Sequence, residues 1–184
     1  VANGTLTNYA DYDFEAKSDQ RVNKEEVAAG TRNYTFAYTM RTGTLADDYN
    51  KWRRKIVMTQ PDSNTVTVFT NHIGQVILHE LKEVSSSKTW LQYFEYDSQA
   101  RGTLHAHPSA VNSWSLASTS SELSVTLETS DGLIELTDYP TSTTATSSTL
   151  GAAKGYGKVQ KIKQGSGGTA DRRGEFKYNQ RNSG

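Results

Sequence analysis

An internal repeat with a period of 26 residues restricts the fold of this chain more than any other feature of its sequence. Three pairs of like residues keep this spacing: Asn71 and Asp97, Leu78 and Leu104, and His79 and His105. In each copy the asparagine or aspartate follows a strand-like segment, and a small residue and a long polar residue come three and four positions later. A fixed period of this kind indicates a chain built from equivalent supersecondary units.

The residue types within each copy predict a tight turn between two strands. Asn71 and Asp97 can each accept a hydrogen bond from the backbone N–H two residues on, which closes an Asx-turn. Gly74 and Ala100 are small, as a turn with unusual backbone angles requires, although a positive φ at Ala100 would cost about 1 kcal/mol relative to glycine. The long polar residue that follows begins the returning strand. Each unit is therefore predicted to be strand, turn, strand, and successive units can pair edge to edge.

Alternation of apolar and polar residues, which is typical of half-buried strands, recurs from residue 34 onward. The predicted strands lie at 34–39, 55–59, 65–70, 75–78 and 90–96, around Leu104, in a hairpin of 123–127 with 133–136, at 158–163 and at 175–178. The expected fold class is all-β, an antiparallel strand meander of strand-turn-strand units. Residues 24–30, where helix formers precede a glycine, predict at most a short helix near the N-terminus.

Composition divides the chain into three segments. Residues 1–33 form a partly irregular N-terminal segment, 34–165 the repeat-like β domain, and 166–184 a glycine-rich C-terminal tail. Inside the β domain, 109–121 is expected to be a polar connection, and the Ser/Thr-rich tract 141–149 is expected to be a mobile loop. The first residues resemble the interior of a longer sequence, so we expect an excised piece of a larger protein.

A low apolar content limits how the core can form. Hydrophobic residues make up 34% of the chain, against a usual level of about 45–50% on a similar count that includes glycine. We therefore expect a thin core in which aromatic side chains supply much of the buried area. Trp90, Phe94 and Tyr96 share one face of a predicted strand and are expected in this core. Trp52 and Trp114 lie in predicted connections and are the candidates for an exposed platform that stacks on sugar rings.

Charge, hydropathy and cysteine content exclude several classes of partner and site. The chain has 20 basic and 20 acidic side chains, so its formal net charge is zero, whereas a nucleic-acid binder needs an excess of Lys and Arg to attract phosphates. No apolar run approaches the roughly 18 residues of a membrane span. The absence of cysteine excludes disulfides and Cys-ligated metal sites. We expect no nucleic-acid partner and no membrane insertion.

The better copy of the repeat carries a family resemblance. Residues 94–101, with the sequence Phe-Glu-Tyr-Asp-Ser-Gln-Ala-Arg, resemble the YD-repeat signature of the RHS family, an aromatic-x-Tyr-Asp-x-x-Gly-Arg pattern. Tyr96, Asp97 and Arg101 match this pattern. Ala100 stands where the family has glycine, and the residue after Arg101 is a glycine where the family has an apolar side chain.

Residues 68–75 are similar to a degenerate copy of the same signature, with Asn71 at the position of the aspartate and Gly74 at that of the glycine. The resemblance implies a β-strand ribbon that in full-length relatives spirals into a hollow shell. Such shells enclose toxin cargo or lie on cell surfaces, and their repeats have been linked with carbohydrate binding. The family's autoproteolytic segment has no counterpart here, so the resemblance implies no catalytic residue.

His105 and His107 raise the question of a metal site. They lie on one face of a predicted strand, so one further ligand, such as His79 on a neighbouring repeat, would complete it. No carboxylate motif accompanies them, and half-exposed strand residues beside the turn at Pro108 are the favoured interpretation. We therefore predict no metal and no cofactor.

Taken together, the pattern predicts a structural protein and not an enzyme. We expect a β-repeat segment of an extracellular or bacterial cell-surface shell or scaffold, with weak carbohydrate binding as a further property. Its expected partners are the remainder of a larger YD-repeat chain, other copies that associate through sheet edges, or carbohydrate. The alternative is a freestanding β-sandwich carbohydrate-binding module. A hydrolase would need two facing carboxylates, and the candidate glutamates are instead expected on solvent faces of strands or beside turns: Glu80, Glu83, Glu122, Glu128 and Glu135.

Overall fold

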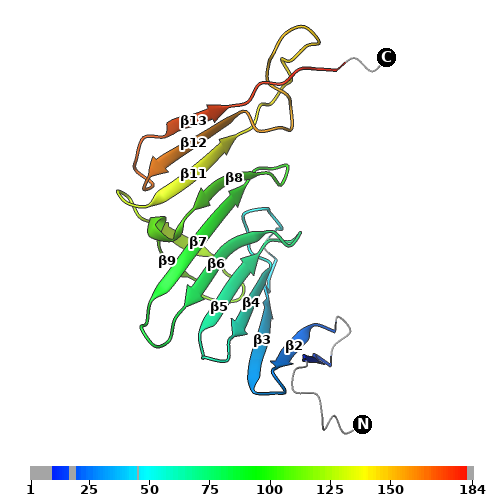
Figure 1. The fold of residues 1–184 in the computed structure, drawn as a ribbon, viewed down its shortest axis with the longest axis vertical. Helices are drawn as coiled ribbons and strands as arrows, with labels where there is room; N and C mark the ends of the chain where they lie inside the picture. Colours follow the sequence, from blue (N-terminus) through cyan, green and yellow to red (C-terminus); the bar gives the residue numbers. More distant parts are fainter. Residues whose placement is uncertain (1–9, 17–19, 45, 182–184) are drawn as a thin grey trace. The chain divides into compact units, whose positions relative to one another are not determined.

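Two compact units of β-strands make up the chain in a computed structural model that describes residues 10–16, 20–44 and 46–181 (Figure 1). Unit 1 comprises residues 1–90 and 116–122, and unit 2 comprises residues 91–115 and 123–184. The described strands of unit 1 are β1 (Asp11–Phe14), β2 (Val22–Val27), β3 (Arg32–Met40), β4 (Arg54–Thr59), β5 (Thr65–Thr70) and β6 (Val76–Lys82). Those of unit 2 are β7 (Thr89–Tyr96, its first two residues in unit 1), β8 (Gly102–Ala106), β9 (Val111–Ser115), β10 (Ser124–Leu127), β11 (Leu133–Asp138), β12 (Val159–Gln164) and β13 (Asp171–Glu175), with one short 3-10 helix, η1 (Pro108–Ala110). No helix among these residues is long and apolar enough to cross a membrane.

Unit 1 is an antiparallel meander in which each strand pairs with the next one along the chain. The ladders run in order from β1 to β6. The predicted all-β antiparallel fold class is thereby confirmed, and β5 occupies the predicted residues. The most buried apolar side chains of unit 1 are Trp52, Phe69, Ile77 and Leu78. Ile77 and Leu78 are consecutive because a bulge in the β5–β6 ladder interrupts the alternation.

The short helix predicted at 24–30 is wrong. These residues lie in β2 and in the turn that follows it, where Ala28, Ala29 and Gly30 have φ values of +52°, +56° and +79°. β2 pairs with β3 on one side and with β1 on the other. A helix of two turns leaves most of its backbone N–H and C=O groups without hydrogen-bond partners, because most of them lie at its ends. In β2, the ladders on both sides supply partners for these groups. Strand pairing therefore outweighs the helix propensity of Lys, Glu and Ala.

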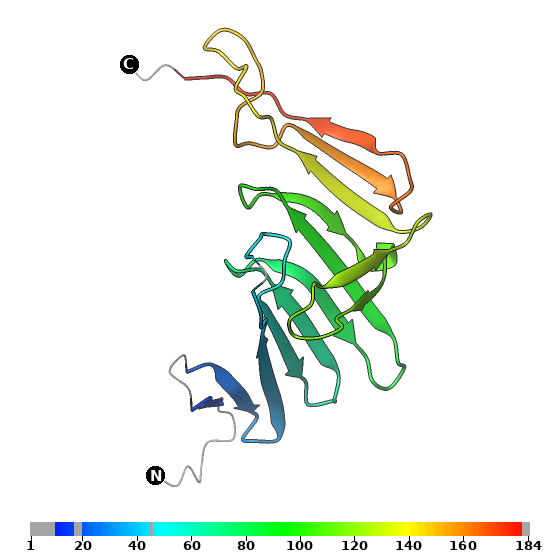
Figure 2. The same cartoon turned by 180° about the vertical axis from the view of Figure 1, so that it is seen from behind.

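Unit 2 contains a five-stranded antiparallel ladder with one connection between strands that are distant in sequence. β7 and β8 form a hairpin, β8 then pairs with β11, and β11, β12 and β13 follow in order. The chain between β8 and β11 forms η1 and a separate two-stranded sheet of β9 and β10, which Figure 2 shows from behind. The most buried side chains of unit 2 are Leu91, Ala106, Ala110, Val111, Ile134 and Ala145.

The predicted hairpin of 123–127 with 133–136 is wrong, because β10 pairs with β9 and β11 pairs with β8 and β12. The expected turn glycine, Gly132, does have a positive φ of +84°. A Cβ at Gly132 would lie 2.2 Å from the backbone of Ser109, so this turn packs directly against η1. The N–H of His107 donates a 3.0 Å hydrogen bond to the carbonyl of Leu133. These contacts direct β11 alongside β8.

Two other predicted segments have a different structure. The polar connection predicted at 109–121 contains most of η1 and all of β9. The last strand, β13, ends at Glu175, where the predicted strand begins. Tyr178 makes only an isolated antiparallel bridge with Gly151.

The Ser/Thr-rich tract at 141–149 forms a loop that contains no strand. The hydroxyl oxygens of Thr143 and Thr144 accept hydrogen bonds of 2.9 and 2.8 Å from backbone N–H groups of the segment that follows. Ala145 is buried. Local hydroxyl-to-backbone bonds thus shape a tract that has too few apolar side chains to form a strand of the core.

Candidate functional site

The two predicted repeat turns have the same side-chain hydrogen bonds. Asn71 Oδ1 accepts bonds of 3.2 and 2.9 Å from the N–H groups of Ile73 and Gln75. Asp97 Oδ1 accepts bonds of 2.8 and 3.0 Å from the N–H groups of the residues two and four positions on. Both copies therefore form the predicted Asx-turn, and each acceptor also holds the first residue after the turn.

The backbone of the two turns is equivalent as well. A pair of bonds closes each loop: in the first copy Asn71 N–H donates to the Gln75 carbonyl (2.9 Å) and Gly74 N–H to the Asn71 carbonyl (3.1 Å), and the bonds at Asp97 measure 2.9 and 3.0 Å. Gly74 has φ +91° and Ala100 has φ +63°. A bulge follows in both ladders at the same repeat position. This geometry is a type I turn followed by a left-handed residue, a common three-residue hairpin loop.

The turn at Asp97 is also held by an ion pair within the repeat signature. Arg101 Nε donates a 2.7 Å hydrogen bond to Asp97 Oδ2, and the Arg101 guanidinium lies 4.3 Å from the ring centroid of Tyr139. Burial by itself raises the pKa of Asp97. The hydrogen bonds from Arg101 and Gln99 and the charge of Arg101 outweigh that effect, so the pKa of Asp97 is lowered. The matching Asp and Arg of the signature therefore support the turn jointly.

The side chain of Asn71 is buried, whereas its counterpart Asp97 is partly exposed. The Asn71 side chain is almost fully buried, and its Nδ2 donates 2.9 Å hydrogen bonds to the carbonyl of Tyr49 and to Gln75 Oε1. The segment before β4 covers this turn, since the ring of Tyr49 lies 5.1 Å from that of His72. An uncharged asparagine suits this position because a buried carboxylate would need a cationic partner.

Two tryptophans have the opposite exposure from that predicted. Trp52 is 0% exposed, its Nε1–H donates a 2.9 Å hydrogen bond to the carbonyl of Ser121, and its ring packs edge-on against Phe69. The prediction of Trp52 as an exposed sugar-binding residue is therefore wrong. Trp90, expected in the core, is 40% exposed. Trp114 is half-buried in β9 and does not lie in a connection.

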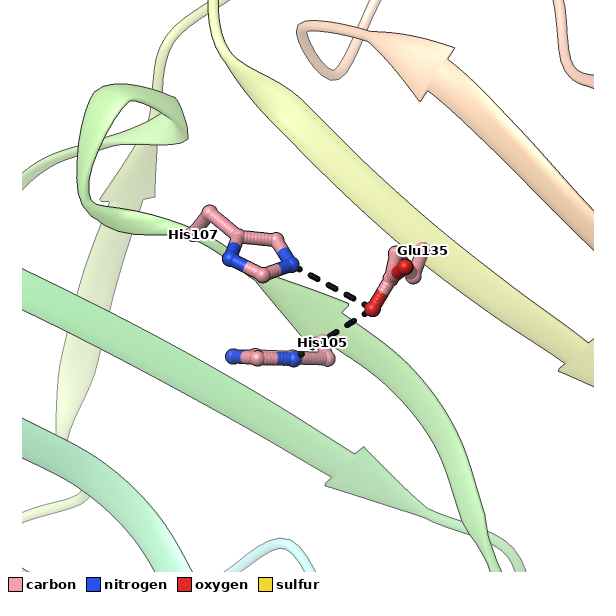
Figure 3. Close-up of side chains that lie close together, drawn as sticks. All are labelled: His105, His107 and Glu135. Atoms are coloured by element: carbon pink, nitrogen blue, oxygen red, sulfur yellow. Dashed lines mark hydrogen bonds and ion pairs between the residues drawn. The ribbon is translucent and has the colours of Figure 1, made fainter.

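A cluster of His105, His107 and Glu135 lies on unit 2 (Figure 3). His105 belongs to β8, His107 follows it before η1, and Glu135 lies opposite His105 in the β8–β11 ladder. One oxygen, Glu135 Oε2, lies 3.2 Å from His107 Nε2 and 3.7 Å from His105 Nδ1. The two imidazole ring centroids are 4.1 Å apart. Two imidazoles and a carboxylate thus converge on one point, on side chains that are half-buried.

Neighbouring groups fix the orientation and protonation of His105. Its Nε2 lies 3.0 Å from Gln92 Oε1 on β7, and its ring stacks on Phe94 with the centroids 4.4 Å apart. Burial lowers the pKa of His105, His107 lowers it further, and Glu135 opposes both effects. The lowered pKa favours the neutral imidazole at pH 7, and the contacts with Gln92 and Phe94 fix the orientation of the ring.

The sequence led to the two histidines but not to their third partner. His79, the expected third ligand, belongs to unit 1 and is not in the cluster. Glu135 was assigned to a solvent face, and no local pattern links it to His105. Only the β8–β11 pairing, which joins segments 28 residues apart, brings Glu135 to His107.

Comparison of the chain with family models, with curated protein sequences and with solved structures finds no match.

Proposed function

We propose that this chain is a structural segment of a YD-repeat-type β ribbon, part of a shell or scaffold at a bacterial surface or outside the cell. The observation that carries the proposal is the pair of equivalent turns at Asn71 and Asp97, 26 residues apart in sequence. The two copies keep the same turn geometry although the first has Gly74 where the second has Ala100. An elongating repeat array is built from such equivalent strand-turn-strand units.

The outermost strands support an array that continues. Among the described strands, β1 pairs only with β2, and β13 pairs only with β12. All four residues of β1 and most of β13 are exposed. Unpaired edges are sites of strand addition, and we infer that the remainder of a longer chain pairs with them. No catalytic step belongs to this proposal.

The test is to determine the coding sequence on both sides of this segment and to image the full-length product by electron microscopy. The expected result is many further Tyr-Asp turn units and a continuous strand ribbon around a hollow interior. A flanking sequence without such units, or a particle in which β1 and β13 remain at free edges, would overturn the proposal.

Carbohydrate binding is a second candidate, and one observation favours it. Trp90 exposes 40% of its surface, and flat indole faces bind ligands through stacking and apolar contact. The expected result of glycan-array and titration experiments is weak saturable binding that Trp90→Ala abolishes. Undiminished binding by Trp90→Ala would exclude this platform.

A freestanding β-sandwich module is less consistent with the strand pairing, because the second sheet in unit 2 has only two described strands.

A further inference from the structure

The proposed scaffold function makes no use of His105, His107 and Glu135, whose side chains supply the nitrogen and oxygen ligands of transition metals. We propose that these three residues bind a divalent transition metal ion, preferentially Zn²⁺, through His105 Nδ1, His107 Nε2 and a carboxylate oxygen of Glu135. This site is independent of the scaffold function and can be tested without it.

The distances fit a tetrahedral ion. With bonds of about 2.0–2.1 Å to nitrogen and oxygen, neighbouring ligands of tetrahedral Zn²⁺ lie about 3.4 Å apart. The carboxylate oxygen lies 3.2 Å from one ligand nitrogen and 3.7 Å from the other. One donor atom from each of the three residues lies within 4.8 Å of the others. Small side-chain rotations therefore suffice to place all three donors around one ion.

A second layer of contacts prepares His105 as a ligand. A metal-bound histidine usually donates its other ring N–H to an oxygen acceptor, which fixes the tautomer and the ring orientation. Gln92 Oε1, 3.0 Å from His105 Nε2, supplies that acceptor, and Phe94 stacks on the ring. These two contacts hold the ring of His105 in one orientation before any ion binds.

The donor set and its surroundings determine the class of ion. Two imidazoles and one carboxylate suit Zn²⁺ and related ions, whereas Ca²⁺ and Mg²⁺ require mainly oxygen ligands. Three protein ligands leave a fourth position open. A pocket of about 160 Å³, lined among others by Phe94, His105 and Glu135, adjoins the cluster and has room for a water molecule there.

Binding would connect two strands that no hairpin joins. His105 and His107 lie on or next to β8, and Glu135 lies on β11. A link between positions far apart in sequence removes more freedom from the unfolded chain than a link across a short hairpin. Because the ion binds the folded form, its binding free energy also adds to the free energy of folding. The bound ion would therefore stabilise unit 2 at the pairing of β8 with β11, which are not consecutive in sequence.

The experiment is isothermal titration of the full chain with ZnCl₂, combined with visible spectroscopy of the Co²⁺ form. The expected result is one tight site per chain and the intense d–d bands of tetrahedral Co²⁺. His107→Ala and Glu135→Gln should each weaken Zn²⁺ binding at least tenfold, and Gln92→Ala by about tenfold. His72→Ala is the matched control and should bind like the parent chain, because His72 lies in unit 1 outside the cluster.

Thermal unfolding supplies an independent measurement. Zn²⁺ at about 100 times its Kd should raise the Tm of the parent chain by about 5 °C or more, and Glu135→Gln, which preserves side-chain shape, should lose about half of this rise or more at the same Zn²⁺ concentration. Circular dichroism confirms that each variant is folded before titration. The proposal is overturned if the parent chain binds no Zn²⁺ beyond the level of a His105→Ala/His107→Ala double variant, or if folded Glu135→Gln retains full affinity and the full rise in Tm.

Discussion

Ala100 occupies a backbone conformation that its own side chain opposes. Its φ of +63° lies in the left-handed region, where a Cβ costs about 1 kcal/mol relative to glycine. The hydrogen bonds of Asp97 and the pairing of β7 with β8 hold it there. The YD-repeat signature that residues 94–101 resemble has glycine at this position. Ala100 keeps the same turn as Gly74, with local backbone strain.

Exchanging glycine and alanine between the two turns tests this strain. Ala100→Gly should raise the free energy of unfolding by about 0.5–1 kcal/mol, and Gly74→Ala should lower it by about 1 kcal/mol. No atom lies within 4 Å of a Cβ built at Gly74, so its cost comes from the backbone alone. Urea unfolding measures both values. Gly102→Ala is the control: Gly102 also has free space around its Cβ and no positive φ, so little or no loss is expected.

Trp52 is a core residue although its position in the sequence predicts an exposed connection. It lies just before β4, outside any strand, yet the hydrogen bond from its indole to Ser121 and its contact with Phe69 bury it completely. Trp52→Ala should lower the free energy of unfolding by about 3–5 kcal/mol, since it removes a large buried ring. Trp90→Ala should lower it by clearly less, because Trp90 is 40% exposed and loses less buried apolar area. Equal losses in chemical denaturation would contradict this assignment of core and surface.

Among the elements, the hairpins of the repeat were predictable and the long-range ladder was not. β4, β5, β6, β7 and β8 follow from alternation and from turn residues, because each of these strands is joined to the next by a short turn. The pairing of β8 with β11 depends on contacts of Gly132 and Leu133 with the segment at η1, which no local pattern encodes. The Glu135 partner of the histidines was missed for the same reason. At β2, pairing on both sides outweighed helix propensity.

The Asp97 turn should respond to acid in a way that the Asn71 turn cannot. The folded pKa of Asp97 lies below its ordinary value of 3.8, so the ionised form is stabilised in the folded state. That stabilisation is complete above the unfolded pKa and is lost as the pH falls through the lower folded pKa. The turn should therefore weaken below about pH 4, by at most about 1 kcal/mol because solvent screens the Asp97–Arg101 pair.

Asp97→Asn separates this effect from general acid unfolding. Asparagine keeps the Oδ1 acceptor of the Asx-turn, as Asn71 does in the other copy, but it has no charge to lose. Its free energy of unfolding should be lower than that of the parent chain at pH 6, and the difference should shrink toward pH 2–3. Urea unfolding at a series of pH values measures the difference. A gap that stays constant with pH would show that Asp97 does not titrate with folding.

At the scale of the whole molecule, β13 is an edge strand of the described sheet. β13 carries Arg172, Arg173 and Glu175 on exposed positions, and charged side chains on an edge limit uncontrolled strand addition. Among the described strands, β13 nevertheless pairs only with β12, so the other side of its backbone has no strand partner there. The N–H of Phe176 donates to the carbonyl of Lys158 on the β12 side, and hydrogen-bonded and non-hydrogen-bonded pairs alternate along an antiparallel ladder. The N–H of Glu175 therefore faces away from β12.

This geometry predicts a specific effect of proline on self-association. If copies of the chain pair through β13, sedimentation equilibrium should show weak, reversible association, and Glu175→Pro should weaken it several-fold because it removes an outward donor. The residue before it, Gly174, tolerates the restriction that proline imposes on its neighbour. Glu175→Ala retains the N–H and should associate like the parent chain, although it loses the ion pair with Arg172. Association that Glu175→Pro leaves unchanged would exclude β13 as the pairing edge. The same experiment would then be applied to β1, which pairs only with β2 among the described strands.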